Sequence, residues 1–502
     1  MDPHWGNSSR VAQEVPSASC LGSFLFSSEL QSEFAGLSGD WNPIHMSLRS
    51  ARRTPVGQPI VHGMHIVLSS LESIAKSPAG LRTLQNLTVK FGKPVYVGEA
   101  IAVRQVSCPG SRLRFEAEVD GATTTELGLG LRDGAVPREK FVFPTGDKAD
   151  LACRELSWPE MATRSGSVGV PAVAEAIIKR FPNASKWLGV GPVAALLCLS
   201  RLVGMECPGL YSLFAGLTLE FSESEAPPVL SYFVSSAHDR FRLLNIQVSG
   251  LGVRGAVEAL ARHAPIRQSS IKELVSAVKP NEFEGQRALI VGGSRGLGEL
   301  TAKVLAAGGG HPVISYSVGK EDAEGVAEEI RVYGGTCDVL KYDVRLPASR
   351  QLDSLRPCPP YAYYFATCHI GRRKTKRFDP ALLDEFLEFY VRGFYRLCEA
   401  LMDRCGQEIS VFNPSSVFVE DRPREMTEYA MAKSAGEILC ADLARCSPGI
   451  YINSTRLPPL LTDQTAVITP VTTPIEMANS IEAIVPIVRD VQAFRDRNGH
   501  FS

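Results

Sequence analysis

The stretch FAGLSGDWNPIHMSLRSARRTPVGQPIVHGM, residues 34–64, is the most informative part of this 502-residue chain. In it Asp40 and His45 stand five positions apart, with Asn42 and Pro43 between them. Asn-Pro favours a turn and prevents a regular helix here, so the carboxylate and the imidazole can be brought together. Such a pair can share a water and carry out acid/base chemistry. The spacing alone also suits a structural role, in which Asp40 caps a helix and His45 is a satisfied structural histidine.

An internal repeat extends this first part of the chain. PAGLRTLQNLTVKF (78–91) aligns without gaps with PGLYSLFAGLTLEF (208–221), and each copy follows an apolar run that reads as a helix, from Gly63 to Ala75 in the first copy. The alternation within the copies is typical of strands. We therefore expect two copies of one small α+β unit. The second copy has no Asp-x4-His pair before its helix, and its His238 and Asp239 are adjacent, in a different context.

The strings FAxLSGDxNPIH and PIVHGM resemble the motif of R-specific enoyl-CoA hydratases of the MaoC-like type, at that family's separation. Its members fold as a hot dog, a long helix wrapped in a curved antiparallel sheet. The resemblance implies that Asp40 and His45 are the catalytic pair and that Gly63 offers its backbone N–H to a thioester carbonyl. A helix N-terminus suits that role because its free N–H groups stabilise developing negative charge. Ser69 and Ser70 follow on the same helix without an assigned role.

By the same resemblance the second copy is a degenerate hot dog. It would complete the sheet and shape an acyl tunnel, and thioester hydrolysis by this copy is the alternative.

From about residue 285 strands alternate with helices, which indicates βαβ units and a parallel sheet. RALIVGGSRGLGELTAKVLA (287–306) places Gly292, Gly296 and Gly298 between a strand and a helix. Glycines at such a turn let the backbone approach a pyrophosphate on the helix N-terminus. Further on, Tyr429 and Lys433 share one face of a predicted helix, at i and i+4.

With Ser416, thirteen residues before Tyr429, these features resemble the short-chain dehydrogenase/reductase family over roughly residues 285–470. The resemblance implies that Tyr429 protonates a carbonyl, that Lys433 lowers the pKa of Tyr429 and holds the nicotinamide ribose, and that Ser416 orients the substrate oxygen. Asp343 would contact the adenine. The residues expected to line the cofactor are Gly292, Ser294, Arg295, Gly296, Leu297, Gly298, Ser317, Asp343, Val344, Ala366, Tyr429 and Lys433.

The reductase part departs from the family pattern at three places. Val291 replaces a usual threonine, Tyr390 stands where the family has a helix asparagine that holds a proton-relay water, and Pro458-Pro459 replaces Pro-Gly. A half that binds cofactor but reduces poorly is therefore an alternative. No acidic residue ends the strand PVISYS (312–317), and Arg295 is positioned to meet a 2′-phosphate, so NADP(H) is favoured over NAD(H).

Two basic patches accompany these motifs: Arg49, Arg52 and Arg53 after the dyad, and Arg372, Arg373, Lys374, Lys376 and Arg377 after a predicted reductase strand. They are read as solvated faces, or as binding sites for coenzyme A phosphates or the acidic surface of an acyl carrier protein.

The composition excludes several other classes of protein. A net charge of −1 argues against nucleic-acid binding. The sequence has no stretch of 18 uninterrupted apolar residues, so it predicts no membrane span. The N-terminus lacks the pattern of a secretory signal. Twelve cysteines are scattered without a CxxC pair, so we expect neither a metal site nor a disulfide framework, but a reducing cytoplasm.

The sequence thus predicts a double hot dog followed by a Rossmann-type doubly wound parallel sheet. The expected ranges are 1–19 for a tail, 20–135 for the catalytic hot dog, 136–165 for a linker, 166–270 for the degenerate repeat, 285–480 for the reductase and 481–502 for a second tail. The predicted enzyme interconverts 3-oxoacyl, R-3-hydroxyacyl and enoyl thioesters of CoA or acyl carrier protein in fatty-acid or polyketide-type biosynthesis. A homodimer is a further expectation. The alternatives are a degradative hydratase/dehydrogenase and an acyl-binding scaffold with one inactive half.

Overall fold

The computed structural model describes residues 20–106, 112–133, 152–222, 228–371, 377–406, 408–465 and 478–498. It divides into two compact units: the first comprises Met1–Met46 and Ile60–Ala261, and the second comprises Ser47–Pro59 and Arg262–Ser502. The short segment 47–59 therefore leaves the first unit and belongs to the second.

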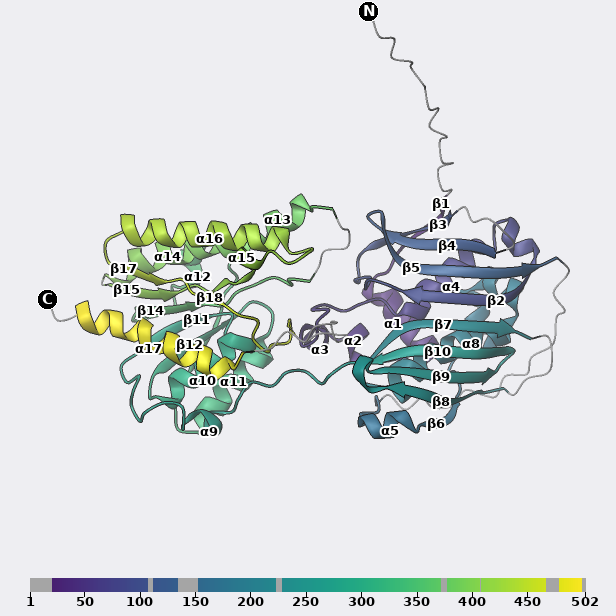
Figure 1. The fold of residues 1–502 in the computed structure, drawn as a ribbon, viewed down its shortest axis with the longest axis horizontal. Helices are drawn as coiled ribbons and strands as arrows, with labels where there is room; N and C mark the ends of the chain where they lie inside the picture. Colours follow the sequence, from purple (N-terminus) through teal and green to yellow (C-terminus); the bar gives the residue numbers. More distant parts are fainter. Residues whose placement is uncertain are drawn as a thin grey trace, which may run out of the picture. The chain divides into compact units, whose positions relative to one another are not determined.

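The first unit is built on a ten-stranded antiparallel sheet in the order β1-β3-β4-β5-β2-β7-β10-β9-β8-β6 (Figure 1). The strands are β1 (Cys20–Leu25), β2 (Thr83–Phe91), β3 (Ala100–Val106), β4 (Arg112–Val119), β5 (Ala122–Arg132), β6 (Ser165–Val168), β7 (Ser212–Phe221), β8 (Leu230–His238), β9 (Leu243–Gly250) and β10 (Val253–Ala261). The helices are α1 (Ser28–Ser38), α2 (Pro43–Met46), α4 (Gly63–Ile74), α5 (Trp158–Ala162), α6 (Ala174–Arg180), α7 (Pro182–Leu188) and α8 (Val190–Arg201).

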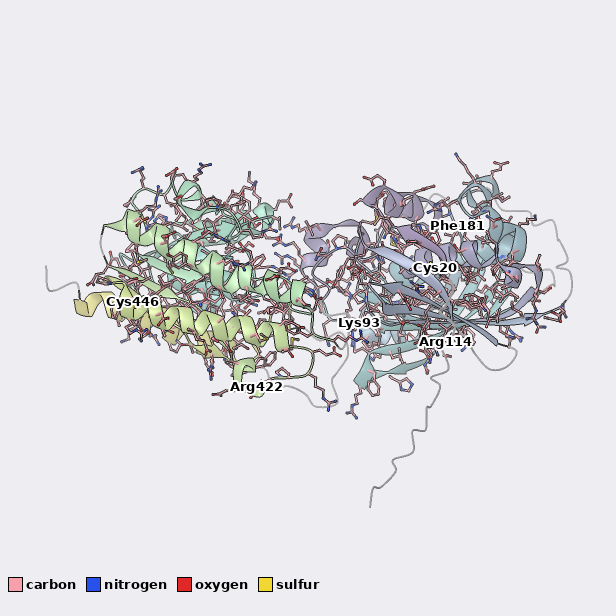
Figure 2. The ribbon with its side chains drawn as sticks, turned by 90° about the horizontal axis from the view of Figure 1, so that it is seen from above. Cys20, Lys93, Arg114, Phe181, Arg422 and Cys446 are labelled. Atoms are coloured by element: carbon pink, nitrogen blue, oxygen red, sulfur yellow. The ribbon has the colours of Figure 1, made fainter. Side chains whose placement is uncertain are left out.

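Helices α4 and α8 are the central helices of this unit. Every residue of α4 after Gly63 is buried, the polar ones included. Its Val67 and Leu71 share one core with Phe115 and Leu127 of the sheet. Phe181, labelled in Figure 2, is also fully buried in this core. A long helix against an antiparallel sheet is the hot-dog arrangement predicted for the first half.

The two halves of this sheet have the same strand order. From the central pair β2 and β7 outward, the first half runs β2-β5-β4-β3-β1 and the second runs β7-β10-β9-β8-β6. Each central strand carries one copy of the repeated sequence and follows one central helix, α4 or α8. The strand order of the two halves therefore follows the sequence repeat.

The second unit contains a six-stranded parallel sheet in the order β13-β12-β11-β14-β15-β17, the doubly wound order predicted from the sequence. The strands are β11 (Arg287–Val291), β12 (His311–Tyr316), β13 (Asp338–Lys341), β14 (Tyr361–Tyr364), β15 (Ile409–Phe412) and β17 (Ile450–Asn453), and β16 (Ser415–Ser416) pairs with β18 (Arg456–Leu457). The helices are α3 (Leu48–Arg52), α9 (Ile271–Leu274), α10 (Gly296–Ala307), α11 (Lys320–Val332), α12 (Ala348–Gln351), α13 (Pro380–Leu387), α14 (Gly393–Cys405), α15 (Phe418–Asp421), α16 (Thr427–Cys446) and α17 (Ser480–Asn498).

The helices of this unit cover both faces of the sheet. Helices α10, α11 and α17 share one buried core with one face of the strands, whereas α14 and α16 contribute to a separate core on the other face (Figure 1). The strands are buried apolar runs, as is typical of a parallel sheet. The strand order reverses between β11 and β14, the point at which such folds bind dinucleotides.

The structure corrects two boundaries of the sequence reading. Residues 481–498, expected as a tail, form α17, whose buried Ile484, Val488 and Val491 lie in one core with residues of α10. These apolar residues recur at helical spacing, but Pro486 and the charged residues around it obscure the pattern in the sequence. Within the expected linker, the described part contains α5, which begins with a capping box between Ser157 and Glu160. Residues 1–19, 134–151 and 499–502 lie outside the described residues.

Among the described residues, no single helix is long and apolar enough to cross a bilayer; one sharply bent pair, Pro182–Leu188 with Val190–Glu206, meets the test of length and composition.

Candidate active sites

Asp40 lies in a buried loop directly after α1. The helix ends at Gly39, whose φ of 76° is in the left-handed region that glycine adopts readily. The carboxylate of Asp40 accepts hydrogen bonds from the backbone N–H of Asn42 at 3.2 Å and from the hydroxyl of Ser200 at 2.7 Å. Burial raises the pKa of Asp40, while the nearby His45 and these two hydrogen bonds act in the opposite direction. The environment therefore favours a carboxyl group that can exchange a proton.

His45 stands near the end of α2, beside Asp40 and His62. Its Nδ1 lies 2.8 Å from the carbonyl oxygen of Ile60, and because a carbonyl only accepts, Nδ1 carries the proton. In the neutral ring Nε2 then has the lone pair. The ring stacks on that of His62 with 3.9 Å between centroids, and one donor atom from each of Asp40, His45 and His62 lies within 4.8 Å of the others. The structure thus brings together the two residues of the predicted dyad.

A chain of buried hydrogen bonds leads to the backbone of Asp40. His62 Nε2 donates to the Asp40 carbonyl oxygen at 3.0 Å, so His62 Nδ1 accepts from the Gln31 amide at 3.0 Å. The Gln31 amide oxygen accepts from His65 Nδ1 at 2.9 Å, and His65 Nε2 accepts from Arg180 at 3.1 Å. Each bond fixes the direction of the next. Both ring nitrogens of His62 are therefore occupied, which favours acid/base chemistry at the cluster over metal ligation.

Burial also keeps these two histidines neutral. It is the largest cause that holds the pKa of His62 and of His65 well below the ordinary histidine value. Neutral rings are consistent with the hydrogen-bond directions, because a protonated ring would have no acceptor nitrogen for Gln31 or Arg180.

Gly63 is the first residue of α4 and follows His62 directly. A Cβ at this position would come within 2.9 Å of the Phe91 ring, so a side chain here would collide with β2. The glycine keeps the helix N-terminus open at the backbone. Further along α4, Ser69 and Ser70 are buried, and the Ser70 hydroxyl donates to the carbonyl of Ile66.

Two residues of the second half, which the sequence reading missed, complete the surroundings of Asp40. Ser200 on α8 donates to the carboxylate, and Gly204 lies in the π-helical turn Leu202–Glu206 that follows. A Cβ on Gly204 would stand 2.2 Å from Oδ1 of Asp40. The side-chain amide of Asn42 donates to the carbonyl of Gly204 at 2.7 Å. The half that lacks a dyad therefore forms part of the wall around Asp40.

The turn between β11 and α10 has the geometry expected for a dinucleotide-binding loop. Gly292 and Gly296 have φ values of 80° and 58°, in the left-handed region. A Cβ on Gly298 would lie 2.3 Å from the carbonyl oxygen of Gly292, so only glycine allows the helix to pack this closely. Ser294 is buried and Leu297 half-buried in the same turn.

The other predicted cofactor residues follow neighbouring strands of the same sheet. Ser317, just after β12, donates to the carboxylate of Asp343 at 3.3 Å. Arg345 binds that carboxylate with two N–H groups at 2.9 and 2.6 Å and is the largest cause that lowers the pKa of Asp343. Val344 is buried, and the backbone N–H of Ala366 lies 3.0 Å from the position that a Cβ on Gly292 would take. Contact of Asp343 with an adenine stays a prediction.

The predicted catalytic group of the reductase is assembled by α16 and β16. Tyr429 and Ser416 are hydrogen-bonded, and burial raises the pKa of Tyr429 to about 12. The ammonium of Lys433 donates to the carbonyl of Pro414 at 2.7 Å and lies 5.8 Å from the centre of the Tyr429 ring. Burial lowers the pKa of Lys433 to about 8. Burial is the largest cause of the raised pKa of Tyr429, and the hydrogen bond to Ser416 acts in the opposite direction. A lowering of this pKa by Lys433 stays a prediction.

Tyr390 occupies the place of the family's helix asparagine. It is buried in the π-helical turn Glu388–Arg392, and its hydroxyl shares a hydrogen bond of 2.5 Å with Thr367. Its ring lies 4.1 Å below the ammonium of Lys433 and 5.7 Å from the ring of Tyr429. The ammonium of Lys433 therefore makes a cation–π contact with Tyr390.

The first basic patch lies in the second unit and pairs with a carboxylate of that same unit. Arg49, Arg52 and Arg53 all approach the buried carboxylate of Asp322, at 3.0, 3.5 and 3.1 Å. Arg295, expected at a 2′-phosphate, donates to the backbone carbonyl of Arg52 and lies 3.6 Å from Asp463. The reading of the first patch as a solvated face is therefore wrong for Arg52, whose side chain is only 12% exposed. Of the second patch, residues 372–376 lie outside the described residues.

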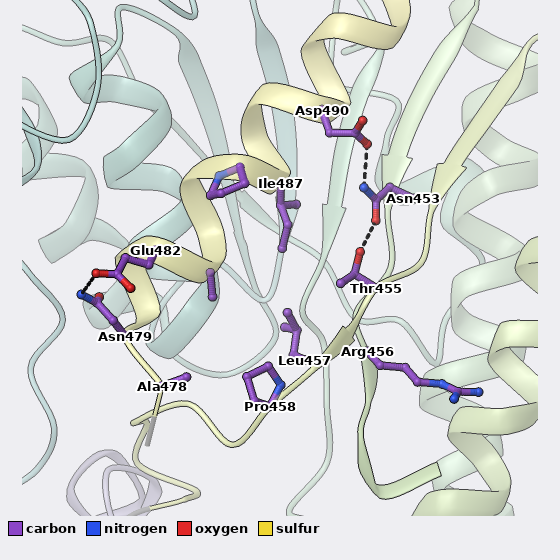
Figure 3. A pocket seen from close by; sticks show the side chains of 12 residues that line it. Asn453, Thr455, Arg456, Leu457, Pro458, Ala478, Asn479, Glu482, Ile487 and Asp490 are labelled. Atoms are coloured by element: carbon purple, nitrogen blue, oxygen red, sulfur yellow. Dashed lines mark hydrogen bonds between the residues drawn. The ribbon is translucent and has the colours of Figure 1, made fainter. Parts of the chain in front are cut away.

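The second unit also has an open hollow between β17, β18 and α17 (Figure 3). Pro458 of the double proline forms part of its wall. Its polar groups bond to one another: Asn453 donates to Asp490 and accepts from Thr455, and Asn479 bonds to Glu482. We assign no ligand to it.

Comparison with known proteins identifies relatives for both parts. Residues 24–128 match the model of the MaoC like domain. A mitochondrial 3-hydroxyacyl-(acyl-carrier-protein) dehydratase from Arabidopsis thaliana is 39% identical over 79 residues, which are 15% of this chain and 46% of that protein. A 3-oxoacyl-(acyl-carrier-protein) reductase from Aggregatibacter actinomycetemcomitans is 34% identical over 173 residues, 31% of this chain and 69% of that protein. L-rhamnose 1-dehydrogenase (NADP(+)) from Thermoplasma acidophilum is 34% identical over 89 residues, 18% of this chain and 34% of that protein.

The chain spans less than half the length of the dehydratase relative and about two thirds of the reductase relative. The reductase match is both close and extensive, and it agrees with the glycine turn and the Tyr429–Lys433 pair on a doubly wound sheet. The chain belongs to the short-chain dehydrogenase/reductase family and carries, at residues 24–128, a MaoC-like dehydratase domain.

Proposed function

We propose that the chain is a bifunctional acyl-thioester enzyme, with a hydratase/dehydratase in its first unit and an NADP(H)-dependent 3-oxoacyl reductase in its second. The observation that carries the proposal is the convergence of Asp40 and His45 beside the N-terminus of α4. A thioester carbonyl at that N-terminus would lie next to an acid/base pair, which is what reversible addition of water to an enoyl thioester requires.

In the hydration direction, Asp40 and His45 hold one water between them. One of the two removes a proton from the water as its oxygen bonds to C3 of the enoyl chain. The negative charge that develops on the thioester oxygen is stabilised by the backbone N–H of Gly63. A proton returned to C2 completes the R-3-hydroxyacyl thioester, and dehydration is the same path reversed.

In the reductase, Ser416 and Tyr429 hydrogen-bond to the substrate carbonyl oxygen. When bound, the nicotinamide supplies the hydride, and Tyr429 gives its proton to the carbonyl oxygen. Lys433 would bind the nicotinamide ribose, and its charge eases proton loss from Tyr429. The glycine turn before α10 fits a pyrophosphate, since Gly292 and Gly296 adopt positive φ and Gly298 lets the helix N-terminus pack closely against the end of β11.

NADP(H) is the proposed cofactor. No carboxylate ends β12, whereas several arginines surround the residues that follow it, and one relative carries NADP(+) in its name. The reducing cofactor and the relatives' carrier-protein names favour the biosynthetic direction over the degradative alternative. The substrates would be thioesters of CoA or acyl carrier protein.

The second half of the ten-stranded sheet is proposed to be a degenerate hot dog, so that the first unit is a double hot dog. The matched strand order supports this, as does the central place of α8. The sequence ranges 20–135 and 166–270 for the two hot dogs and 285–480 for the reductase are part of the proposal, with α17 now added to the reductase. The described cysteines are all free thiols, consistent with a reducing cytoplasm. A homodimer stays a prediction from sequence.

An acyl-binding scaffold with an inactive reductase is the second candidate, and Tyr390 is the observation that favours it. Two assays on the purified chain separate the candidates: loss of the enoyl absorbance of crotonyl-CoA, and NADPH oxidation with a 3-oxoacyl thioester. We expect Asp40→Asn to abolish only the first and Tyr429→Phe only the second. Hydration without reduction in the wild type would support the scaffold reading of the second unit, and absence of both activities would exclude the proposed enzyme.

A further inference from the structure

The segment 47–59, which belongs to the reductase unit, contacts the loops that follow three neighbouring strands of the parallel sheet. After β11, Arg295 donates to the backbone carbonyl of Arg52. After β12, Gly319 faces the Arg52 guanidinium so closely that a Cβ on Gly319 would stand 2.4 Å from Nη1. After β14, His369 Nε2 lies 2.5 Å from the carbonyl oxygen of Pro55.

These contacts locate the segment relative to the cofactor. In a doubly wound sheet the dinucleotide lies outside the carboxyl ends of the strands, around the point where the strand order reverses. That point is between β11 and β14 here, and the loop after β12 receives the adenosine ribose. The segment therefore borders the expected cleft, with Arg52 at its adenosine end.

The charges around Arg52 do not balance. The guanidinium groups of Arg49, Arg52, Arg53 and Arg295 face the carboxylates of Glu321, Asp322 and Asp463, so four positive groups meet three negative ones. Arg52 and Arg295 are only 12% and 23% exposed, and Asp322 is 1% exposed. A surplus positive charge at a largely buried position is unfavourable unless an anion joins it.

Arg52 is better placed than Arg295 to receive that anion. Arg295 donates one N–H to the backbone carbonyl of Arg52 and lies next to Asp463. Its guanidinium is therefore engaged in anchoring the segment 47–59. Arg52 is oriented by Asp322, at the first turn of α11, and presents its guanidinium against Gly319. The absence of a side chain on Gly319 leaves room for that guanidinium beside the end of β12.

We propose that Arg52, oriented by Asp322 and assisted by Arg53, binds the 2′-phosphate of NADP(H), so that a segment from the hydratase part of the sequence completes the cofactor site of the reductase. This inference rests on the proposed reductase function. A planar guanidinium suits the phosphate because it can donate two parallel hydrogen bonds.

The test is direct titration of the full-length chain with NADPH and NADH, and with ADP-ribose with and without a 2′-phosphate. Arg52→Gln removes the positive charge but keeps a polar side chain, and Arg52→Lys keeps the charge but loses the two parallel N–H donors of the guanidinium. We expect Arg52→Gln to lower the affinity for NADPH and for 2′-phosphorylated ADP-ribose by about tenfold or more. This is the usual effect of losing a charge-assisted hydrogen bond. NADH and plain ADP-ribose should bind as before, and Arg52→Lys should fall in between.

Arg49→Gln is the matched control, because Arg49 pairs with the same Asp322 but is 56% exposed, and the three atoms nearest to a Cβ on Gly319 all belong to Arg52. It should weaken NADPH less than Arg52→Gln does. An unchanged ratio of NADPH to NADH affinity in Arg52→Gln, with hydration activity intact as a sign of folding, would overturn the inference alone. A wild-type chain that binds neither dinucleotide would instead overturn the proposed reductase function.

Discussion

At the scale of single residues, the hydroxyl of Ser200 is one of the groups that influence the charge state of Asp40. Its hydrogen bond favours the ionised carboxylate, against the burial that raises the pKa of Asp40. Ser200→Ala removes that bond, so the pKa of Asp40 should rise further. We expect the acidic limb of the kcat/KM profile for hydration to move to higher pH. The pH-independent value of kcat/KM should also fall by about tenfold, the usual effect of losing a hydrogen bond to a charged group.

Ser185→Ala is a suitable control for this measurement. Ser185 is a buried serine of α7 in the same half of the sheet, and its hydroxyl has no hydrogen-bond partner among the described residues. It should leave the pH profile in place. An acidic limb that stays put in Ser200→Ala would show that Ser200 does not act through Asp40.

The lowered pKa of Lys433 predicts an upper pH limit for the reductase activity. Burial lowers its pKa to about 8, whereas the pKa of Tyr429 is raised to about 12. Below pH 8 both groups hold their protons, so Tyr429 can donate and Lys433 is positively charged. Reduction of a 3-oxoacyl thioester should fall as the pH rises through about 8, because Lys433 then loses its charge.

Lys433→Arg tests this assignment, since a guanidinium keeps its charge far above that pH. The alkaline limb should disappear or move upward, even if the rate at neutral pH is lower. The same alkaline limb in Lys433→Arg as in the wild type would assign the titration to another group.

How far the sequence predicts the site depends on distance along the chain. Asp40, His45 and Gly63 lie in one continuous stretch, so the resemblance of that stretch to the MaoC-like motif predicts all three together. Ser200 and Gly204 lie 160 and more positions away, in a repeat without a dyad, and only the pairing of the two halves brings them to Asp40. Tyr390 was recognised as a departure, but its place beneath Lys433 depends on a π-helical turn that no local pattern announces.

At the scale of elements, the π-helical turn Leu202–Glu206 after α8 gives a second test of the second half. A Cβ on Gly204 would stand 2.2 Å from the Asp40 carboxylate, so Gly204→Ala must displace either the turn or that carboxylate. We expect hydration to fall by about tenfold or more, with reduction unchanged. Enoyl-thioester hydration and NADPH oxidation, measured on the same preparation, check both parts.

Gly36→Ala is the matched control on α1. Nothing lies within 4 Å of the Cβ that it adds, so it should keep full hydration activity and slightly stabilise the helix. Normal hydration in Gly204→Ala would mean that Asp40 tolerates the displacement and that the second half is only structural support.

The elements themselves were predictable to different degrees. Helix α4 and the strands of the parallel sheet follow from apolar runs in the sequence. The hot dog was predicted from the resemblance to the MaoC-like motif, and the doubly wound sheet from the alternation of strands with helices around the glycine turn. Helix α17 was missed because its buried residues Ile484, Val488 and Val491 are interrupted by Pro486 and charged positions. The segment 47–59 could not be assigned to the reductase from sequence, because its partners Asp322 and Arg295 lie more than 240 positions further on.

At the scale of the whole molecule, the value of joining these two activities depends on stereochemistry. MaoC-like hydratases, which the first unit resembles, act on the R alcohol. The reductase therefore supplies the hydratase only if the hydride reaches the face of the 3-oxo group that yields the R-3-hydroxyacyl thioester. Linking the two active sites in one chain raises the local concentration of that intermediate at the second site.

We expect the wild-type chain, given a 3-oxoacyl thioester and NADPH, to form some enoyl thioester without another enzyme. The equilibrium constant for addition of water to the enoyl thioester is close to one, so the product should be a mixture of alcohol and enoyl thioester. Asp40→Asn should stop at the alcohol, and chiral chromatography of that alcohol is the decisive measurement. An R alcohol is the expected result. If the alcohol is S, the hydratase cannot use what the reductase makes, and the two units must act on different substrates despite sharing one chain.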